Sequence, residues 1–254
     1  YRNYYTSTSF NSCAFYRVQG AATPCTQSTA SGFSTRRPNV QFNLLPRPTV
    51  QSNTITLNVN PCVSALNLTL FTEGYFDQSN TSKQVLFNQG IDPNPGSTLV
   101  DTFEVRWHNS TAPYAVVHTE KGLLQTNGLL AVSFPSSLNG TSYYLSLHHR
   151  NTLETWSASP LNMASVVNYD FSNAASQAYG SNQTAVGSGS VFALFTGDIN
   201  QDGVVDGLDF VEWETDNLNF SAGYFGTDFN GDGVVDGLDF IVWETNNLLF
   251  VGMI

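Results

Sequence analysis

Acidic residues are absent from one end of this chain, and basic residues are absent from the other. Residues 1–72 contain five Arg and no Asp or Glu, whereas residues 196–254 contain twelve Asp and Glu and no Lys or Arg. The stretch between them has eight acidic and four basic side chains, and the whole chain has a formal net charge of −11. This acidic balance argues against nucleic acid as the main partner.

Long apolar runs, lysine and methionine are also scarce. No run of eighteen apolar residues occurs, which argues against insertion into a membrane. The 254 residues include only two Lys and two Met but 13% aromatic residues, a composition that suits an extracellular β-protein better than a cytosolic enzyme. The chain opens Tyr-Arg-Asn-Tyr-Tyr, without an initiator Met or a signal peptide, and we expect a mature processed protein or an excised fragment.

The cysteines are few, namely Cys13, Cys25 and Cys62. An oxidising compartment favours one disulfide. A Cys13–Cys25 bridge would close a short loop and leave Cys62 unpaired, whereas a bridge from Cys62 to either of the others would tie the N-terminal segment to the next domain. Three buried cysteines without a bond are the remaining alternative.

The first segment, residues 1–60, is rich in Ser, Thr, Asn, Gln and aromatic residues and carries four prolines. It predicts an extended or irregular basic arm. The arm ends in one expected strand, Thr54–Asn60, in which Ile55, Leu57 and Val59 alternate with polar residues.

Residues 61–195 show period-two alternation typical of strands. Asn127-Gly128 and Asn139-Gly140 are turn signals, and the first predicts a hairpin whose two central residues have positive φ. No segment in this range has helical periodicity. The prediction is an antiparallel, immunoglobulin-like β-sandwich of about seven or eight strands. The alternating apolar sets are Leu66, Leu68 and Leu70; Phe103, Val105 and Trp107; Tyr143, Leu145 and Leu147; and Val167, Tyr169 and Phe171.

An internal duplication begins near Thr196. Segments 197–220 and 227–250 align without gaps at an offset of thirty, and seventeen of the twenty-four aligned positions are identical. The identities include Trp213 with Trp243 and Phe220 with Phe250. A third domain, residues 196–254, therefore consists of two similar units.

Each unit contains a twelve-residue loop rich in carboxylates, which would repel one another strongly without a cation. Ca²⁺ takes six to eight oxygen ligands, and an EF-hand-type loop supplies them from positions 1, 3, 5, 7, 9 and 12, with a glycine at position 6 for the sharp turn. Gly203 and Gly233 occupy position 6. The loops therefore predict two Ca²⁺ sites, against the alternative of two acidic turns that bind no metal. The expected ligands are Asp198, Asn200, Asp202, the Val204 carbonyl, Asp206 and Asp209 in the first loop, and Asp228, Asn230, Asp232, the Val234 carbonyl, Asp236 and Asp239 in the second.

No helix is expected before either loop, but a short helix is expected after each, beginning near Leu208 and Leu238. This duplicated loop-then-helix pattern resembles the type I dockerin family of bacterial extracellular proteins. The resemblance covers about residues 196–254 and implies two Ca²⁺ ions, a small α-helical module with near two-fold pseudo-symmetry, and an extracellular or cell-surface location. Dockerins typically bind a cohesin through residues near loop positions 10 and 11, which here are Gly207-Leu208 and Gly237-Leu238 instead of a hydroxyl-bearing pair.

The preceding sandwich resembles a module that is often joined to such repeats in bacterial secreted and surface proteins. The resemblance rests on the stretch Tyr144–Trp156 and on Asn168-Tyr169-Asp170-Phe171.

An enzyme is not expected. Nucleophile-elbow, Walker-loop and zinc-protease motifs are absent, and adjacent His148 and His149 on a strand would point to opposite faces. Trp107, Tyr143, Tyr144 and Trp156 could form a platform for carbohydrate, although core packing explains most of them more simply.

The charge segregation leads to the functional prediction. We expect a non-catalytic extracellular structural protein, stabilised by calcium, whose basic arm contacts the acidic module of another copy. Such head-to-tail contacts give filaments when they do not close into rings. The alternatives are that the charge split is incidental, or that the repeats are an anchoring module that binds another cell-surface protein and carries an adhesive or carbohydrate-binding sandwich.

Overall fold

The computed structural model describes residues 62–77 and 79–253, together with the backbone of four short strands nearer the N-terminus. The chain divides into two compact units, Tyr1–Cys62 and Val63–Ile254. In the first unit β1 pairs with β4 and β2 with β3, both antiparallel. The expected strand Thr54–Asn60 lies outside the described residues. The four strands are β1 (Tyr4–Ser7), β2 (Cys13–Phe15), β3 (Gly32–Ser34) and β4 (Arg36–Asn39).

Cys62 is disulfide-bonded. Of the alternatives left open by the sequence, the Cys13–Cys25 bridge and the three cysteines without a bond are therefore both wrong. The choice between Cys13 and Cys25 as its partner lies outside the described residues.

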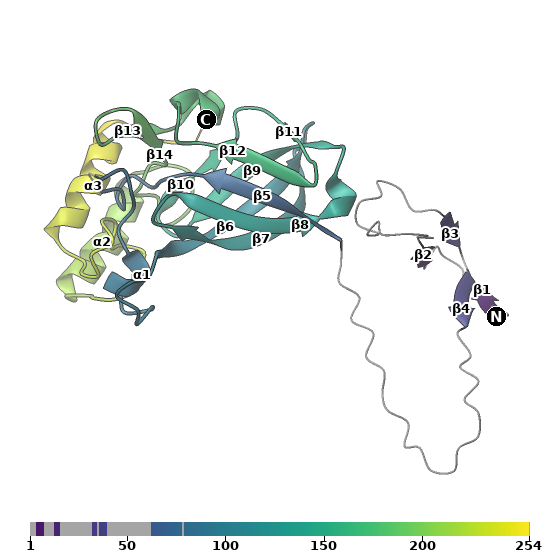
Figure 1. Ribbon diagram of the computed structural model, residues 1–254. Helices are drawn as coiled ribbons and strands as arrows, with labels where there is room; N and C mark the ends of the chain where they lie inside the picture. The colour runs from purple at the N-terminus through teal and green to yellow at the C-terminus, as the bar shows by residue number, and fades with distance from the viewer. Residues whose placement is uncertain are drawn as a thin grey trace, which may run out of the picture. The chain divides into compact units, whose positions relative to one another are not determined.

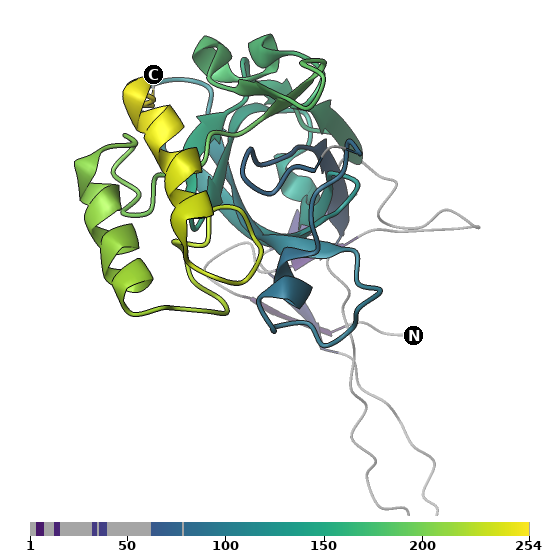
Figure 2. The ribbon, with the colours of Figure 1, turned by 90° about the vertical axis from the view of Figure 1, so that its left-hand side faces the viewer.

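The second unit is built on an eight-stranded sheet with the order β10-β9-β6-β7-β8-β5-β12 (Figure 1). The eighth strand, β11, pairs with the first residues of β9. The sheet curls so that its two halves face each other (Figure 2). β5 and β12 run parallel, so the expectation of a purely antiparallel sandwich is wrong at this edge. The strands are β5 (Val63–Thr69), β6 (Leu99–Asn109), β7 (Val116–Gln125), β8 (Leu129–Pro135), β9 (Ser142–His149), β10 (Thr152–Trp156), β11 (Leu161–Asn162) and β12 (Val166–Asp170), and a separate pair β13 (Thr184–Val186) and β14 (Val191–Ala193) follows.

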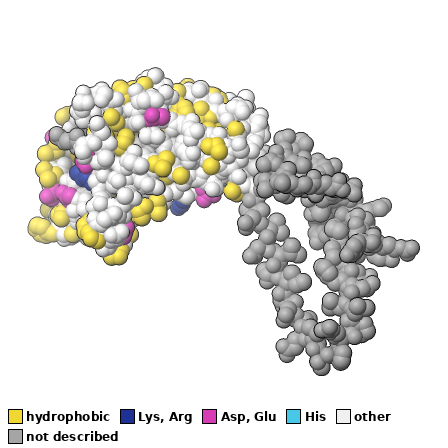
Figure 3. Space-filling model, viewed as in Figure 1, with side chains coloured by type: hydrophobic (Ala, Val, Ile, Leu, Met, Phe, Trp, Pro, Cys, Tyr) yellow, Lys and Arg dark blue, Asp and Glu magenta, His cyan; other side chains and the backbone are white. Residues whose placement is uncertain are grey.

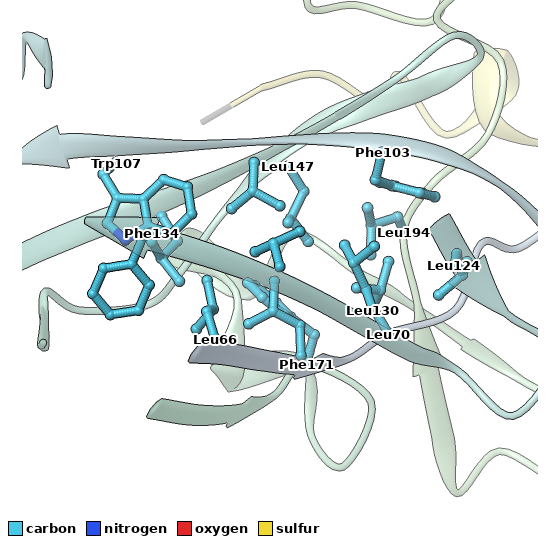
Figure 4. Packing of buried hydrophobic residues seen from close by; sticks show 14 of the residues in the cluster. Leu66, Leu70, Phe103, Trp107, Leu124, Leu130, Phe134, Leu147, Phe171 and Leu194 are labelled. Atoms are coloured by element: carbon cyan, nitrogen blue, oxygen red, sulfur yellow. The ribbon is translucent and has the colours of Figure 1, made fainter. Parts of the chain in front are cut away.

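Alternate side chains of these strands fill the space between the two halves (Figure 4). Phe103, Trp107 and Leu147 enter from one half, and Leu66, Leu130 and others enter from the other. Burial of such side chains, at about 1.5–3 kcal/mol each, stabilises the sandwich. The alternating sets expected from the sequence all point inward, with Val167 and Tyr169 only partly buried.

Both expected turns are present, but the first differs in type. Gly128 has φ +82°, while Asn127 is not among the described residues with positive φ. The amide of Gly128 donates to the carbonyl of Gln125, so Thr126 and Asn127 occupy the turn and the glycine follows it. This is a three-residue hairpin loop with a glycine bulge instead of a two-residue turn. Asn139-Gly140 leads into β9 as expected, with Gly140 at φ +81°.

Short helical elements interrupt the strands. A single turn, α1 (Val85–Asn88), was not expected, because four residues are too few to show helical periodicity. The 3₁₀ turns are η2 (Ser136–Leu138), η3 (Ala175–Gln177) and η4 (Tyr179–Ser181). No helix among residues 62–77 and 79–253 is long and apolar enough to cross a membrane.

The helices α2 (Gly207–Leu218) and α3 (Gly237–Leu248) each follow an acidic loop, as the sequence predicts, and lie side by side (Figure 2). Phe210, Trp213, Phe240 and Trp243 pack between them, with ring centroids 5.2–6.0 Å apart. These residues belong to a second, smaller hydrophobic core. The second core also includes Leu153 of β10, so the boundary expected at residue 196 lies inside one compact unit and does not divide the two cores cleanly.

Candidate metal centre

The two acidic loops are wound around their first aspartate. Asp198 Oδ2 accepts a hydrogen bond from the amide of Gly203, and Asp228 Oδ2 accepts one from Gly233, at 3.2 and 2.8 Å. These glycines have φ +89° and +91°, a backbone conformation that favours glycine. The position-1 carboxylate thus reaches across the loop to position 6 in both copies.

The last aspartate of each loop closes it onto the following helix. Asp209 and Asp239 are the third helical residues of α2 and α3, and each accepts from the backbone amide of the N-cap residue, Asp206 or Asp236. Their other oxygens accept from loop amides at position 3, Asn200 and Asn230. Loop and helix therefore form one hydrogen-bonded unit, a reciprocal capping box at each helix start.

The two loop–helix repeats also form matching hydrogen bonds with each other. Trp213 Nε1 donates to the Asp236 carbonyl at 3.3 Å, and Trp243 Nε1 donates to the Asp206 carbonyl at 3.0 Å. Val204 and Val234 form isolated β-bridges with Gly252 and Ala222, the segments that follow the opposite helix. This pairwise exchange explains why the tryptophans recur at the same position of both repeats.

Burial and mutual repulsion disfavour the ionised form of the loop carboxylates. Burial and the neighbouring Asp209 raise the pKa of Asp198 to about 6. Burial, together with Asp228 and Asp232, raises the pKa of Asp239 to about 7. Buried carboxylates whose pKa is raised by one another are the environment that a bound cation would relieve.

The residues present fit a hard divalent cation in their donor set. Asp198 Oδ1 is buried without a hydrogen-bond partner. In the described part of the chain, the backbone hydrogen bonds of both β-bridges involve loop positions 6 and 8. They leave the carbonyls of Val204 and Val234, at position 7, unused. Carboxylate, amide and carbonyl oxygens are the ligands Ca²⁺ prefers.

The side-chain geometry is not that of a preformed site. Among the described residues, no group of three His, Cys, Asp or Glu side chains is placed to hold a metal ion. The Asp209 and Asp239 carboxylates turn toward backbone amides instead. The sequence spacing brings all twelve expected ligands into two loops, while the convergence of their oxygens stays a prediction.

The second loop is buried against the sandwich, whereas the first is more exposed and contacts it through Gln201, whose Nε2 donates to the Thr152 carbonyl at 3.3 Å. Residues 228–231 are all buried, whereas Asn200, Gln201 and Asp202 are exposed. A Cβ on Gly231 would lie 2.6 Å from Val85 Cγ2, which explains why the repeat has glycine here and glutamine at residue 201. The contacts that hold the second loop are Gln89 Nε2 to Asp228 Oδ2 at 2.7 Å, Lys83 Nζ to the Asn230 carbonyl at 2.6 Å, and Asn88 Nδ2 to the Gly231 carbonyl at 2.8 Å.

Arg150 is the centre of a polar cluster beneath this loop. Its guanidinium donates to Asp101 Oδ2 at 2.7 Å, to Gln89 Oε1 at 2.8 Å and to the Tyr75 hydroxyl at 2.9 Å, and it also bonds the Phe225 carbonyl. Burial opposes ionisation of Asp101, but His149 and Arg150 hold its pKa well below its ordinary range. Sequence reasoning missed this cluster, because its members come from positions far apart in the chain.

The adjacent histidines point to opposite faces, as expected. His149 Nε2 lies 3.1 Å from Asp101 Oδ2 in the interior, and His148 Nε2 lies 3.1 Å from Glu154 Oε1 on the outer face. The four aromatic residues considered for carbohydrate also divide. Trp107 and Tyr143 belong to the core, while Tyr144 and Trp156 line an outer cleft.

No family model and no curated protein matches the chain. Among solved structures, one chain from the crystal structure of an N-terminal interface mutant of a type II cohesin–X-dockerin complex from Acetivibrio cellulolyticus matches with a TM-score of 0.41 and 12% sequence identity. The match covers 72% of this chain and 95% of that chain. A likeness this distant carries no argument about the site, which rests on the residues above.

Proposed function

We propose that this protein is a non-catalytic, extracellular structural protein whose duplicated loops each bind one Ca²⁺ ion. The first ion would be held by Asp198, Asn200, Asp202, the Val204 carbonyl, Asp206 and Asp209, and the second by the corresponding residues from Asp228 to Asp239. The ion supplies positive charge where carboxylates otherwise repel. The observation that carries the proposal is the same carboxylate-to-glycine winding in two loops thirty residues apart.

Calcium binding is tested by counting ions on the intact protein. Native mass spectrometry in calcium should find two ions per chain for the natural protein. Asp198→Asn and Asp228→Asn, which change the same position of the two loops, should each bind one. A natural protein that binds no calcium at micromolar concentration would overturn the proposal.

The calcium would fasten the helices to the sandwich. Because the second loop is bonded to Gln89, Lys83 and Asn88, an ion there would stiffen the contact between the two hydrophobic cores. The chain would then behave as one rigid subunit, which suits a structural role.

We extend the proposal to assembly between copies. The segment 196–254 has a charge of −12 and keeps −8 after two Ca²⁺ ions, whereas residues 1–72 carry +5. Opposite charges at the two ends of one chain favour a heterologous contact between copies. Electron microscopy of the full-length protein should show filaments or tubes in calcium and dispersed particles in excess chelator.

The arm is tested separately from the calcium. Removal of residues 1–50 should abolish the polymers while the protein still binds two calcium ions. Intact polymers from the truncated protein would rule out the arm as the assembling element.

A second candidate function is docking to another surface protein through α2 and α3. Apolar residues at matched positions of the two repeats, within the helices and just after them, face solvent (Figure 3). Leu208 and Leu238 are 61% and 57% exposed, and Phe220 and Phe250 are 89% and 90% exposed. A contiguous exposed apolar surface indicates an interaction site. A monodisperse monomer that binds a cohesin-like partner would favour docking over self-assembly.

The non-catalytic part of the proposal is supported by the ion pairs of the half-buried carboxylates on the outer face. Glu104 is paired with Arg106, and although burial opposes ionisation, His148 and Trp156 hold the pKa of Glu154 below its ordinary value. A lowered pKa makes Glu154 unsuited to act as the general acid that glycosidic cleavage needs.

A further inference from the structure

An aromatic cleft of about 280 Å³ lies on the outer face of the sandwich, away from the core. It is lined by Tyr114, Tyr144, Trp156, Tyr179 and Met253. Tyr144 and Trp156 come from β9 and β10, Tyr114 from the loop between β6 and β7, and Tyr179 from η4. Tyr114 and Tyr179 are about half exposed, at 46% and 49%, so the cleft is open to a ligand.

The rings form walls instead of a packed stack. Tyr114 and Tyr144 have centroids 6.0 Å apart and an interplanar angle of 85°, and Tyr144 and Tyr179 are 6.4 Å apart at 85°. Tyr114 stands at 82° to Trp156. Since no two of these rings stack face to face, flat π surfaces remain for a ligand. Such surfaces carry negative charge density, which attracts the weakly positive C–H groups of a ligand.

The ring of Trp156, the largest in the cleft, is held in place from two sides. The ring of His108 lies 4.0 Å from it, centroid to centroid, and Trp156 Nε1 donates to Glu154 Oε1 at 2.6 Å. His108 is itself fixed by bonds to the Tyr114 carbonyl and the Ser146 hydroxyl, at 2.9 and 2.8 Å. A platform fixed before binding loses less entropy when a ligand arrives.

A polar groove of about 730 Å³ adjoins the cleft, and Met253 borders both. Glu104, Arg106, Lys121, His148 and Glu154 line it. The groove therefore offers hydrogen-bond donors and acceptors next to an aromatic surface. Sugars have the same division, because a pyranose ring carries apolar C–H faces and a rim of hydroxyls that both donate and accept.

We propose that this cleft binds a pyranose unit of a carbohydrate chain. The sugar ring stacks on Trp156 between the tyrosine walls, and its hydroxyls bond to His148 and Glu154 in the adjoining groove. The neighbouring units of the chain run along the groove. This inference goes beyond the structural function proposed above by naming a ligand.

An aromatic box also suits a quaternary ammonium group, which binds to aromatic faces through its charge. The groove argues for the sugar. Arg106 and Lys121 stand beside Glu104 there, so the cleft does not open onto a purely anionic surface. A mixed set of donors and acceptors serves hydroxyl groups better than it serves a cation.

The test uses the full-length protein in calcium, titrated with cellohexaose, chitohexaose, xylohexaose and mannohexaose. Isothermal titration calorimetry and tryptophan fluorescence should show saturable binding of at least one of them. Tyr179→Ala and Trp156→Ala should each weaken that binding by about tenfold or more, because each removes a stacking surface. Ile91→Ala removes an exposed apolar side chain that lines neither the cleft nor the groove, and should leave the affinity unchanged.

Tyr179 is the more secure of the two positions, because its exposed side chain is not part of the core. Circular dichroism checks that both variants fold, and Tyr179→Phe should retain binding. Three results would overturn the inference: no hexasaccharide binds, binding is unaffected by either alanine variant, or choline chloride binds in the cleft and the sugars do not. Failure of the calcium proposal would show in the ion count, whereas failure of this inference would show in the titration with the hexasaccharides.

Discussion

Two glycines with the same backbone conformation have different surroundings, and this difference decides how the two loops behave. Gly203 has φ +89° and Gly233 has φ +91°. A Cβ on Gly203 would meet only the Met253 side chain, at 3.5 Å, whereas a Cβ on Gly233 would overlap the backbone carbonyl of Asn88. At the sixth position of both loops, any residue other than glycine would have a strained backbone. In the second loop alone, the side chain would also overlap neighbouring backbone.

Alanine at these positions should separate strain from packing. Gly203→Ala should lower the free energy of unfolding by about 1–3 kcal/mol, the cost of a non-glycine residue in this conformation. Gly233→Ala should lower it by a further 1–3 kcal/mol or so, because backbone must move away from the new methyl group. Urea denaturation in saturating calcium measures both. Equal losses would show that the second loop is not held against α1 in solution.

The raised pKa values of Asp198 and Asp239 predict an unusual pH dependence for the metal-free protein. An aspartate titrates near 3.9 in the unfolded chain, so the folded protein binds more protons between about pH 4 and 7. In excess chelator, stability should therefore increase as the pH is lowered from 8 to 5. Urea midpoints at each pH unit measure this change.

Asp239→Asn provides the control, since it removes the group with the highest of these pKa values, about 7. The variant should be more stable than the natural protein in chelator at pH 8, and its stability should vary less between pH 8 and 6. A metal-free natural protein that loses stability steadily over this range would contradict the interpretation.

At the scale of the elements, the sequence predicts what is local. Strand alternation predicts the inward side chains of β5, β6 and β9, and the duplicated pattern predicts α2 and α3 to within one residue of their starts. The parallel pairing of β12 with β5 could not be predicted, because alternation shows which face of a strand is buried and not the direction of its neighbour.

The polar cluster around Arg150 could not be predicted for a related reason. Its partners Tyr75, Gln89 and Asp101 precede it by 49 to 75 residues, and no spacing in the sequence marks them. The same holds for the aromatic cleft, in which Tyr114 and Tyr179 join residues that the sequence did single out. Contacts between distant segments depend on topology, which a single sequence does not display.

Arginine-to-lysine substitutions test whether this cluster joins the elements. Arg150→Lys keeps the charge but loses the forked donor set, and should cost about 2–4 kcal/mol of unfolding free energy. Arg106→Lys is the matched change at an exposed arginine paired with Glu104, and should cost less than about 1 kcal/mol. Thermal denaturation compares the two variants. Similar losses would mean that Arg150 is no more important than a surface ion pair.

At the scale of the whole molecule, the two calcium sites should not be equivalent. Loop 198–209 is exposed over its third to fifth positions, while loop 228–239 is bonded to residues 83–89 of the sandwich. Loss of calcium from the first loop should affect mainly that loop and the segments bonded to it. Loss of calcium from the second loop should also alter the sandwich, because Gln89 bonds both Asp228 and Arg150.

Hydrogen exchange with and without chelator measures this difference. Calcium removal should speed amide exchange throughout residues 196–253, because binding energy at such loops is largely folding energy. In calcium, Asp198→Asn should speed exchange in the first loop, in α2 and in residues 251–253, which are bonded to that loop. Asp228→Asn should also speed it in residues 75–89, which contact the second loop. The turn at 136–141, whose backbone hydrogen bonds reach neither loop, serves as the internal control and should not change. If the two variants affected residues 75–89 alike, the second loop would not be the mechanical link between the cores. Calcium would then stabilise the helices alone, and the rigid-subunit argument for assembly would lose its basis.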